Sequence, residues 1–167
     1  MKQLAFLVVM MAIFATGCEQ VISGAGHRAA AEWVFSHGGT VNISGTSLEL
    51  SSANDLPEEP FEVLRINLNQ TETPITDTDL EELPEPGRLE YLGLHSAQIT
   101  NKGIDHLLHL RSLQELELSY TEIGDEGLDK LQELPNLSTL HLWGTRVTND
   151  AVERFQSKHA DCKVIRD

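Results

Sequence analysis

The chain has 167 residues, about the length of one domain, and a formal charge of −14 from 12 basic and 26 acidic residues. This charge argues against nucleic-acid binding, because contacts to phosphate need Lys and Arg. Hydrophobic residues make up 40% of the chain, enough for one core, and two cysteines provide neither a disulfide framework nor a four-cysteine zinc site.

The first residues have the pattern of a secretory signal. Lys2 precedes an apolar run, residues 4–15, that is shorter than the roughly 20 residues a membrane-spanning helix needs. Residues 15–18, ATGC, resemble a bacterial lipobox, with Ala15 where Leu is most usual. The resemblance implies that residues 1–17 are a lipoprotein signal peptide and that Cys18 is acylated, which would anchor the protein to a membrane.

Two alternatives remain open for this segment. The chain could carry an ordinary signal peptide cut before Cys18, or be a cytosolic protein with an apolar start. A lipidated Cys18 cannot pair with Cys162, so a disulfide between them is compatible only with these alternatives. Otherwise Cys162 serves as a small buried hydrophobe. We expect residues 18–26 to form a flexible tether.

Residues 27–60 predict a helix followed by a hairpin. His27–Ser36 has apolar residues on one helical face, with Trp33 as its anchor, and two glycines end it. Short alternating strands are expected at residues 40–43 and 47–50, joined by a turn at Gly45 and paired with the unit that follows. Residues 51–60 are expected to be a loop.

An internal repeat begins after this hairpin. Leu89, Leu113 and Leu137 recur at 24-residue steps (113 − 89 = 24), and five further apolar columns keep the same step. A fourth unit precedes them, with Ile66 lying 26 residues before Leu92 (92 − 66 = 26). Its two extra residues fall between the strand and the helix of that unit.

The columns predict a strand and a helix in each unit. Alternating leucines, as at Leu116 and Leu118, have the period of a strand, and the later spacing of three is that of a helical face. Asp or Asn at positions 77, 101, 125 and 149 can cap the helices, and the preceding threonines could do the same. Thr73, Thr121 and Thr145 recur at one position after the strands. We expect their hydroxyls to make the hydrogen bonds to the backbone that a ladder of polar side chains makes in a stacked array.

This pattern resembles a leucine-rich repeat over residues 61–160. Its consensus sequence is similar to that of bacterial, planctomycete-like secreted repeat proteins. The resemblance implies an α/β fold, a right-handed leucine-rich repeat solenoid with a parallel sheet on its concave face and short helices on its convex face. It also implies an N-terminal helix–hairpin cap at residues 27–60. Residues 161–167 would add a C-terminal cap strand. Caps are needed because terminal repeats otherwise expose their cores.

The outward residues of the strands are the candidates for binding a protein partner. Aromatic and Arg side chains are common anchors at interfaces. Trp143 could instead pack against the C-terminal cap. Two imidazoles and a carboxylate among the candidates, His95, Glu117 and His141, could in principle hold zinc, but they fall in two columns and are expected to be solvated polar residues. The candidate protein-binding residues are Arg65, Tyr91, His95, Glu117, His141 and Trp143.

These observations predict a lipid-anchored protein that binds a protein partner at the bacterial cell envelope. The membrane contact would run through Cys18. We expect no catalytic residues, no metal, no cofactor and no nucleic-acid partner. The alternative is a structural module of the envelope with no dedicated ligand, and an enzyme is the weakest interpretation because no catalytic set can be named.

Overall fold

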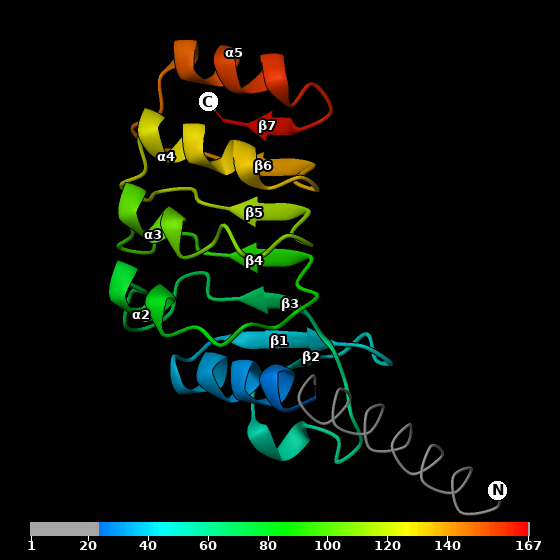
Figure 1. Cartoon of the computed structure of the whole chain (residues 1–167). Coiled ribbons are helices and arrows are strands. Elements are labelled where there is room, and N and C mark those ends of the chain that lie inside the picture. Colours follow the sequence, from blue (N-terminus) through cyan, green and yellow to red (C-terminus); the bar gives the residue numbers. More distant parts are fainter. Residues whose placement is uncertain (1–23, 167) are drawn as a thin grey trace, which may run out of the picture.

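A computed structural model describes residues 24–166 and contains a seven-stranded sheet. Its strands lie in the order β2 (Glu49–Leu50), β1 (Thr40–Ile43), β3 (Val63–Asn67), β4 (Tyr91–Gly93), β5 (Glu115–Glu117), β6 (Thr139–His141) and β7 (Lys163–Ile165). Strands β3 to β7 run parallel, and the short helices α2 (Asp77–Glu81), α3 (Asn101–Asp105) and α4 (Asp125–Lys130) follow one another along one side of the sheet (Figure 1). No helix among the described residues is long and apolar enough to cross a membrane. The signal peptide and the lipidation site, Cys18, lie outside the described residues.

The described chain opens in a helix that ends at Ser36. Residues 24–26, expected in the flexible tether, are already helical. The buried face of this helix is formed by Ala30, Ala31 and Val34, whereas the expected anchor, Trp33, is only partly buried. Trp33 packs against the margin of the core, and its ring lies beside that of His37, tilted by 34° with 4.1 Å between ring centroids.

The expected hairpin is present and joins the repeats in an antiparallel manner. β1 (Thr40–Ile43) pairs with β2 (Glu49–Leu50) on one side and with β3 (Val63–Asn67) on the other. β2 is shorter than expected, and Leu48 lies outside it with 67% of its surface exposed. The loop at 51–60 contains a short 3-10 helix, η1 (Ala53–Asp55).

The following units each contribute one strand, and most add a short helix on the opposite side of the core. The expected C-terminal strand is present as β7, which lies parallel to β6. The remaining elements are α2 (Asp77–Glu81), β4 (Tyr91–Gly93), α3 (Asn101–Asp105), β5 (Glu115–Glu117), α4 (Asp125–Lys130), η2 (Leu131–Glu133), β6 (Thr139–His141), α5 (Asn149–Lys158) and β7 (Lys163–Ile165).

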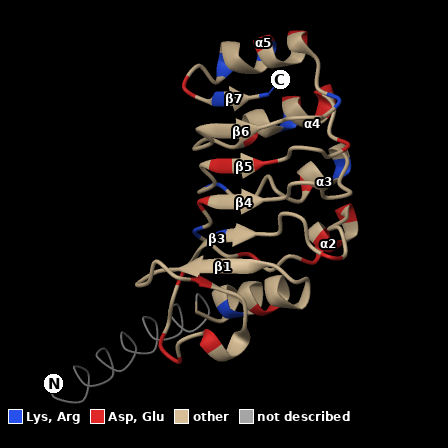
Figure 2. Ribbon diagram, turned by 180° about the vertical axis from the view of Figure 1, so that it is seen from behind, with Lys and Arg blue, Asp and Glu red and all other residues tan. Residues whose placement is uncertain are grey.

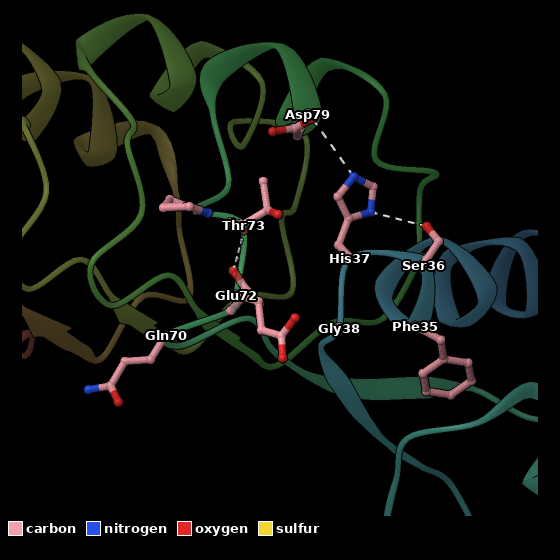
Figure 3. A pocket seen from close by; sticks show the side chains of 10 residues that line it. Phe35, Ser36, His37, Gly38, Gln70, Glu72, Thr73 and Asp79 are labelled. Atoms are coloured by element: carbon pink, nitrogen blue, oxygen red, sulfur yellow. Dashed lines mark hydrogen bonds and ion pairs between the residues drawn. The ribbon is translucent and has the colours of Figure 1, made fainter.

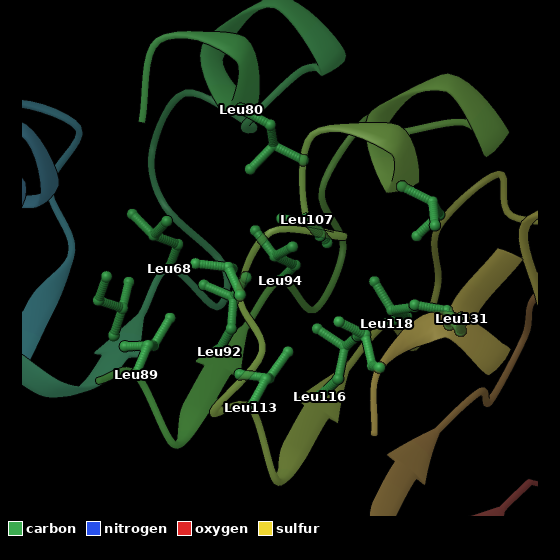
Figure 4. Packing of buried hydrophobic residues seen from close by; sticks show 14 of the residues in the cluster. Leu68, Leu80, Leu89, Leu92, Leu94, Leu107, Leu113, Leu116, Leu118 and Leu131 are labelled. Atoms are coloured by element: carbon green, nitrogen blue, oxygen red, sulfur yellow. The ribbon is translucent and has the colours of Figure 1, made fainter. Parts of the chain in front are cut away.

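The strand register reproduces the sequence columns. Ile66, Leu92, Leu116, Leu140 and Val164 lie side by side across the five parallel strands. The first four are fully buried, and the leucines of neighbouring units pack on one another (Figure 4). Each fully buried Leu or Ile contributes about 1.5–3 kcal/mol, so stacking of the units supplies the core. The seven strands and the accompanying helices fit an α/β repeat fold.

The polar residues at the helix starts have two different roles, whereas the sequence predicted that all of them could cap their own helices. Threonine caps its own helix, as when Thr100 Oγ1 accepts from the amide of Lys102 at 3.2 Å. The Asp or Asn that follows reaches to the next unit instead: Asp77 accepts from the amide and the hydroxyl of Thr100, at 2.8 and 2.7 Å. Asn101 and Asp125 repeat this contact with Gly124 and Thr148.

Glycine makes room for this inter-unit contact. A Cβ at Gly103 would lie 2.5 Å from Asp77 Oδ1, and one at Gly127 would lie 2.7 Å from Asn101 Oδ1. The threonine hydroxyls at 121 and 145 donate within their own unit, to the carbonyls three residues earlier, and do not bridge units. The Asp or Asn at the helix start is therefore a side-chain link that recurs from one unit to the next.

Candidate functional site

The outward side chains of β3 to β6 form a surface that we call the strand face. Its residues fall in three rows that cross the sheet, because the strands are in register. The first two rows are Arg65, Tyr91, Glu115 and Thr139, and Asn67, Gly93, Glu117 and His141. The third row lies two residues past the strand ends and contains Asn69, His95, Ser119 and Trp143, of which Ser119 is buried.

Four of the six predicted binding residues belong to one polar cluster, held together by Glu115. The Arg65 guanidinium lies over the Tyr91 ring, 4.0 Å from its centroid, and 3.4 Å from Glu115 Oε2. Glu115 Oε1 in turn lies 3.3 Å from His141 Nε2, and His141 Nδ1 lies 3.5 Å from Glu117 Oε2. Arg65, Tyr91, Glu115, His141 and Glu117 are therefore one connected set, which we call the polar cluster.

The polar cluster fixes its own side chains. The Tyr91 hydroxyl accepts a hydrogen bond from Asn69 at 3.0 Å, and burial, with Glu115 and Glu117 nearby, raises the pKa of Tyr91. Glu117 Oε1 accepts from the Ser119 amide at 2.7 Å. This arrangement offers a preformed, charged surface rather than an isolated reactive group.

The other two predicted residues, His95 and Trp143, lie on a second feature that includes Tyr120. The Tyr120 ring meets the His95 ring edge-on, with 5.1 Å between centroids, and it covers Gly144, where a Cβ would lie 2.7 Å from the ring. Tyr120 exposes 60% of its surface and Trp143 exposes 43%. We call His95, Tyr120 and Trp143 the aromatic line.

Tyr120 was not among the residues predicted from the sequence. It has a left-handed backbone, with φ of 60°, as do Gln70, Ser96 and Gly144 at the same position of the other units. Left-handed geometry is uncommon for a bulky side chain and is worth explaining when it occurs. Gly144, at the same position of the next unit, indicates the left-handed geometry in the sequence. Tyr120 could have been identified as the aromatic residue that shares this position.

The zinc alternative finds no support in the geometry. The structure places Glu117 and His141 side by side, but His95 belongs to the neighbouring row. Within residues 24–166, no group of three or more His, Cys, Asp or Glu side chains is arranged to hold a metal ion.

A separate pocket of about 620 Å³ lies between the end of the N-terminal helix and the extra residues of the first unit (Figure 3). Ser36, His37 and Asp79 line it in the order of a nucleophile–base–acid set: Ser36 Oγ lies 3.2 Å from His37 Nδ1, and His37 Nε2 lies 3.8 Å from Asp79 Oδ1.

The hydrogen bonds of this pocket do not suit nucleophilic catalysis. His37 Nδ1 lies 2.8 Å from the carbonyl oxygen of Trp33, so it must donate a proton there and cannot accept one from Ser36. The Ser36 hydroxyl donates to the same carbonyl at 2.7 Å. Asp79 Oδ2 accepts from Thr76 and completes a capping box for α2. These side chains therefore act in helix termination and capping.

Comparison with known proteins supports the repeat. A family model described as Leucine Rich repeat matches residues 109–131, which include β5 and all of α4. A search of curated proteins gives no match to this chain. A leucine-rich repeat is thus present at residues 109–131 within an α/β repeat fold, and domains built from such repeats generally mediate protein–protein interaction.

Proposed function

We propose that this protein is a lipid-anchored leucine-rich repeat protein that binds a protein partner through its strand face at the bacterial cell envelope. The observation that carries the proposal is the exposure of Tyr120 and Trp143 on the strand face. Large aromatic side chains are enriched at interface centres, and two exposed ones beside an ordered polar cluster supply the apolar area and the polar contacts that a partner needs.

The proposal includes the architecture of the array. The repeats would form a right-handed solenoid with the strand face as its concave side, as in secreted, planctomycete-like repeat proteins. The helix and hairpin at residues 27–60 would be the N-terminal cap, supported by the antiparallel pairing of β1 on β3. β7 and α5 would close the other end, with Cys162 buried among them.

The membrane anchor is tested by changing its cysteine. Cys18 precedes the first described residue by six positions (24 − 18 = 6), so the domain would lie close to the bilayer. We expect the wild-type chain to partition into the detergent phase and Cys18→Ala to remain unprocessed or to be released. Normal processing and membrane retention of Cys18→Ala would contradict lipid anchoring.

Partner binding is tested by truncating one aromatic anchor. Trp143→Ala should weaken capture of a partner from solubilised envelope by about 2 kcal/mol or more without lowering the melting temperature. Glu133→Ala, an exposed change on the opposite side, should leave both unchanged. Lys130 is a poorer control, because it pairs with Asp105 at 2.9 Å and so supports the stacking of α4 on α3.

The alternative function is a structural envelope module with no dedicated ligand. It would tolerate loss of the exposed aromatics and depend only on the buried leucines. Full activity in the cell of a chain that carries Trp143→Ala and Tyr120→Ala together would favour this alternative. We propose no enzymatic activity.

A further inference from the structure

The aromatic line has a regular spacing because the backbone ladder continues beyond the strands. The amides of Gln70, Ser96 and Tyr120 donate to the carbonyls of His95, Ser119 and Trp143 in the next unit, at 3.1, 2.9 and 2.6 Å. His95 and Trp143 are therefore two strand positions apart. Neighbouring strands are about 4.8 Å apart, so this separation is about 9.6 Å along the array.

This separation matches one turn of a polyproline II helix. Such a helix has three residues per turn and rises about 3.1 Å per residue, which gives about 9.3 Å per turn. Two prolines three residues apart lie on the same side of that helix. They could therefore contact His95 and Trp143 at the same time, with the Tyr120 ring between the two contacts.

The central ring of the aromatic line contacts a neighbour on each side. Tyr120 is held by its contact with the His95 ring on one side and by the Gly144 backbone on the other. Its hydroxyl and the indole N–H of Trp143 can donate hydrogen bonds, and the carbonyls of a polyproline II helix are free to accept them because that helix has no internal hydrogen bonds. Binding between two preformed surfaces loses little conformational entropy.

The charge around the aromatic line determines which kind of ligand can stack on its rings. The Glu117 carboxylate lies beside the middle of the aromatic line, since it accepts from the Ser119 amide at 2.7 Å. β5, with the sequence Glu-Leu-Glu, gives the sheet an acidic centre (Figure 2). Together with the net charge of −14, this disfavours nucleic acids, whose bases would otherwise stack here, and favours a basic residue beside the prolines.

We propose that the aromatic line binds a proline-rich segment of the partner protein in the polyproline II conformation, with a Lys or Arg of that segment paired to Glu117. This inference rests on the proposed function and specifies the chemistry of the partner. Aromatic-lined surfaces recognise proline-rich peptides because the peptide is already ordered before it binds.

The test uses the full chain in mild detergent and a synthetic ten-residue peptide with two Pro-x-x-Pro turns and one flanking arginine. Calorimetry should show binding of this peptide and none of the same peptide with alanine in place of proline. Trp143→Ala and Tyr120→Ala should each weaken binding by about tenfold or more. Leu48→Ala, which truncates an exposed apolar side chain far from the aromatic line, should not change it.

The carboxylate is tested separately. Glu117→Gln should weaken the arginine-flanked peptide and leave a peptide without arginine unaffected, so that the difference between the two peptides disappears. Equal weakening of both peptides would overturn the assigned role of Glu117.

Three results would overturn the inference. The alanine peptide could bind as well as the proline peptide, Trp143→Ala could bind the peptide unchanged, or a soluble oligosaccharide could occupy the aromatic line in place of the peptide. If Trp143→Ala loses a captured envelope protein that excess peptide does not displace, the inference fails while the proposed function stands. If no partner depends on the strand face, the proposed function itself fails.

Discussion

His27 illustrates how one buried side chain ties the N-terminal helix to the sheet. It is 4% exposed, and its Nδ1 accepts a hydrogen bond from the Val63 amide of β3 at 3.0 Å. Burial lowers the pKa of His27 below its ordinary value of 6.5, although Glu62 nearby opposes the shift. Because Nδ1 must be unprotonated to accept this bond, the folded protein holds His27 neutral.

This arrangement predicts a pH-dependent stability. As pH falls from about 6.5 towards the lowered pKa, the unfolded chain binds a proton at His27 and the folded chain does not, so the free energy of unfolding decreases. Urea unfolding between pH 7.5 and 5 should show this loss, and His27→Gln should remove part of it. His109→Gln, at an exposed position, should leave the pH dependence intact; an equal effect of both changes would contradict the assignment to His27.

The assignment of inward and outward side chains along the strands can be tested at two adjacent residues. Leu118 is fully buried between neighbouring units, whereas Glu117 points outward into the polar cluster. Leu118→Ala should lower the free energy of unfolding by about 2–5 kcal/mol, and Glu117→Ala should lower it far less. Chemical unfolding of the two variants provides the measurement. Similar losses of the free energy of unfolding would show that the assignment of inward and outward side chains is wrong.

The helices of this protein are too short to be stable by themselves, so contacts between neighbouring units must hold them. α2 and α3 have five residues each, less than two turns. Their starts are fixed by a threonine cap and by the Asp or Asn that reaches to the following unit. Asp125 shows the same effect in its ionisation, since hydrogen bonds from the Thr148 amide and hydroxyl lower the pKa of this carboxyl.

Removal of one inter-unit contact should therefore affect two elements. Asp77→Ala leaves the Thr100 amide without its partner and should destabilise the protein by about 1–3 kcal/mol. Hydrogen exchange should show faster opening of both α2 and α3. Lys102→Ala, an exposed change on α3, is the control, and a loss confined to α2 would argue that Asp77 serves only its own helix.

At the scale of elements, most of the structure could be predicted because each unit repeats the same apolar pattern. The leucine columns gave the register of β4 to β6, and the alternation of residues 163–165 gave β7. Two features could not be read in this way. Trp33 is apolar enough for a core but lies at its edge. The left-handed backbone at Tyr120 is indicated in the sequence only by Gly144 at the same position of the next unit.

The candidate site could be predicted only in outline. Strand alternation places Arg65, Tyr91, Glu117 and His141 on one face, but it does not show that Glu115 joins them into one cluster. Likewise the columns do not show that the rings of His95 and Tyr120 meet. Such contacts depend on side-chain rotamers across units, which a periodic pattern leaves undetermined.

The whole molecule is a series of units that contact mainly their neighbours, so its stability should depend on the number of units in phase. Deletion of residues 101–124 removes 24 residues (124 − 101 + 1 = 24) and joins Thr100 to Asp125. We expect a folded chain with a lower melting temperature by circular dichroism. Deletion of residues 101–122 removes 22 and should abolish cooperative unfolding, because the leucine columns no longer coincide. Equal behaviour of the two deletions would contradict the stacked-unit architecture.

The residue that lies beneath the inter-unit contact differs between the first unit and the later ones. In the second and third units, Gly103 and Gly127 leave room for the side chain of the unit before them, and the last unit has Ala151 at this position. The first unit has Asp79 there, engaged in its own capping box, and the edge of its strand is covered by β1. Asn149 at the far end is exposed. A small residue that leaves room for the preceding unit is therefore present from the second unit onward, and the first unit begins the array with a different side chain.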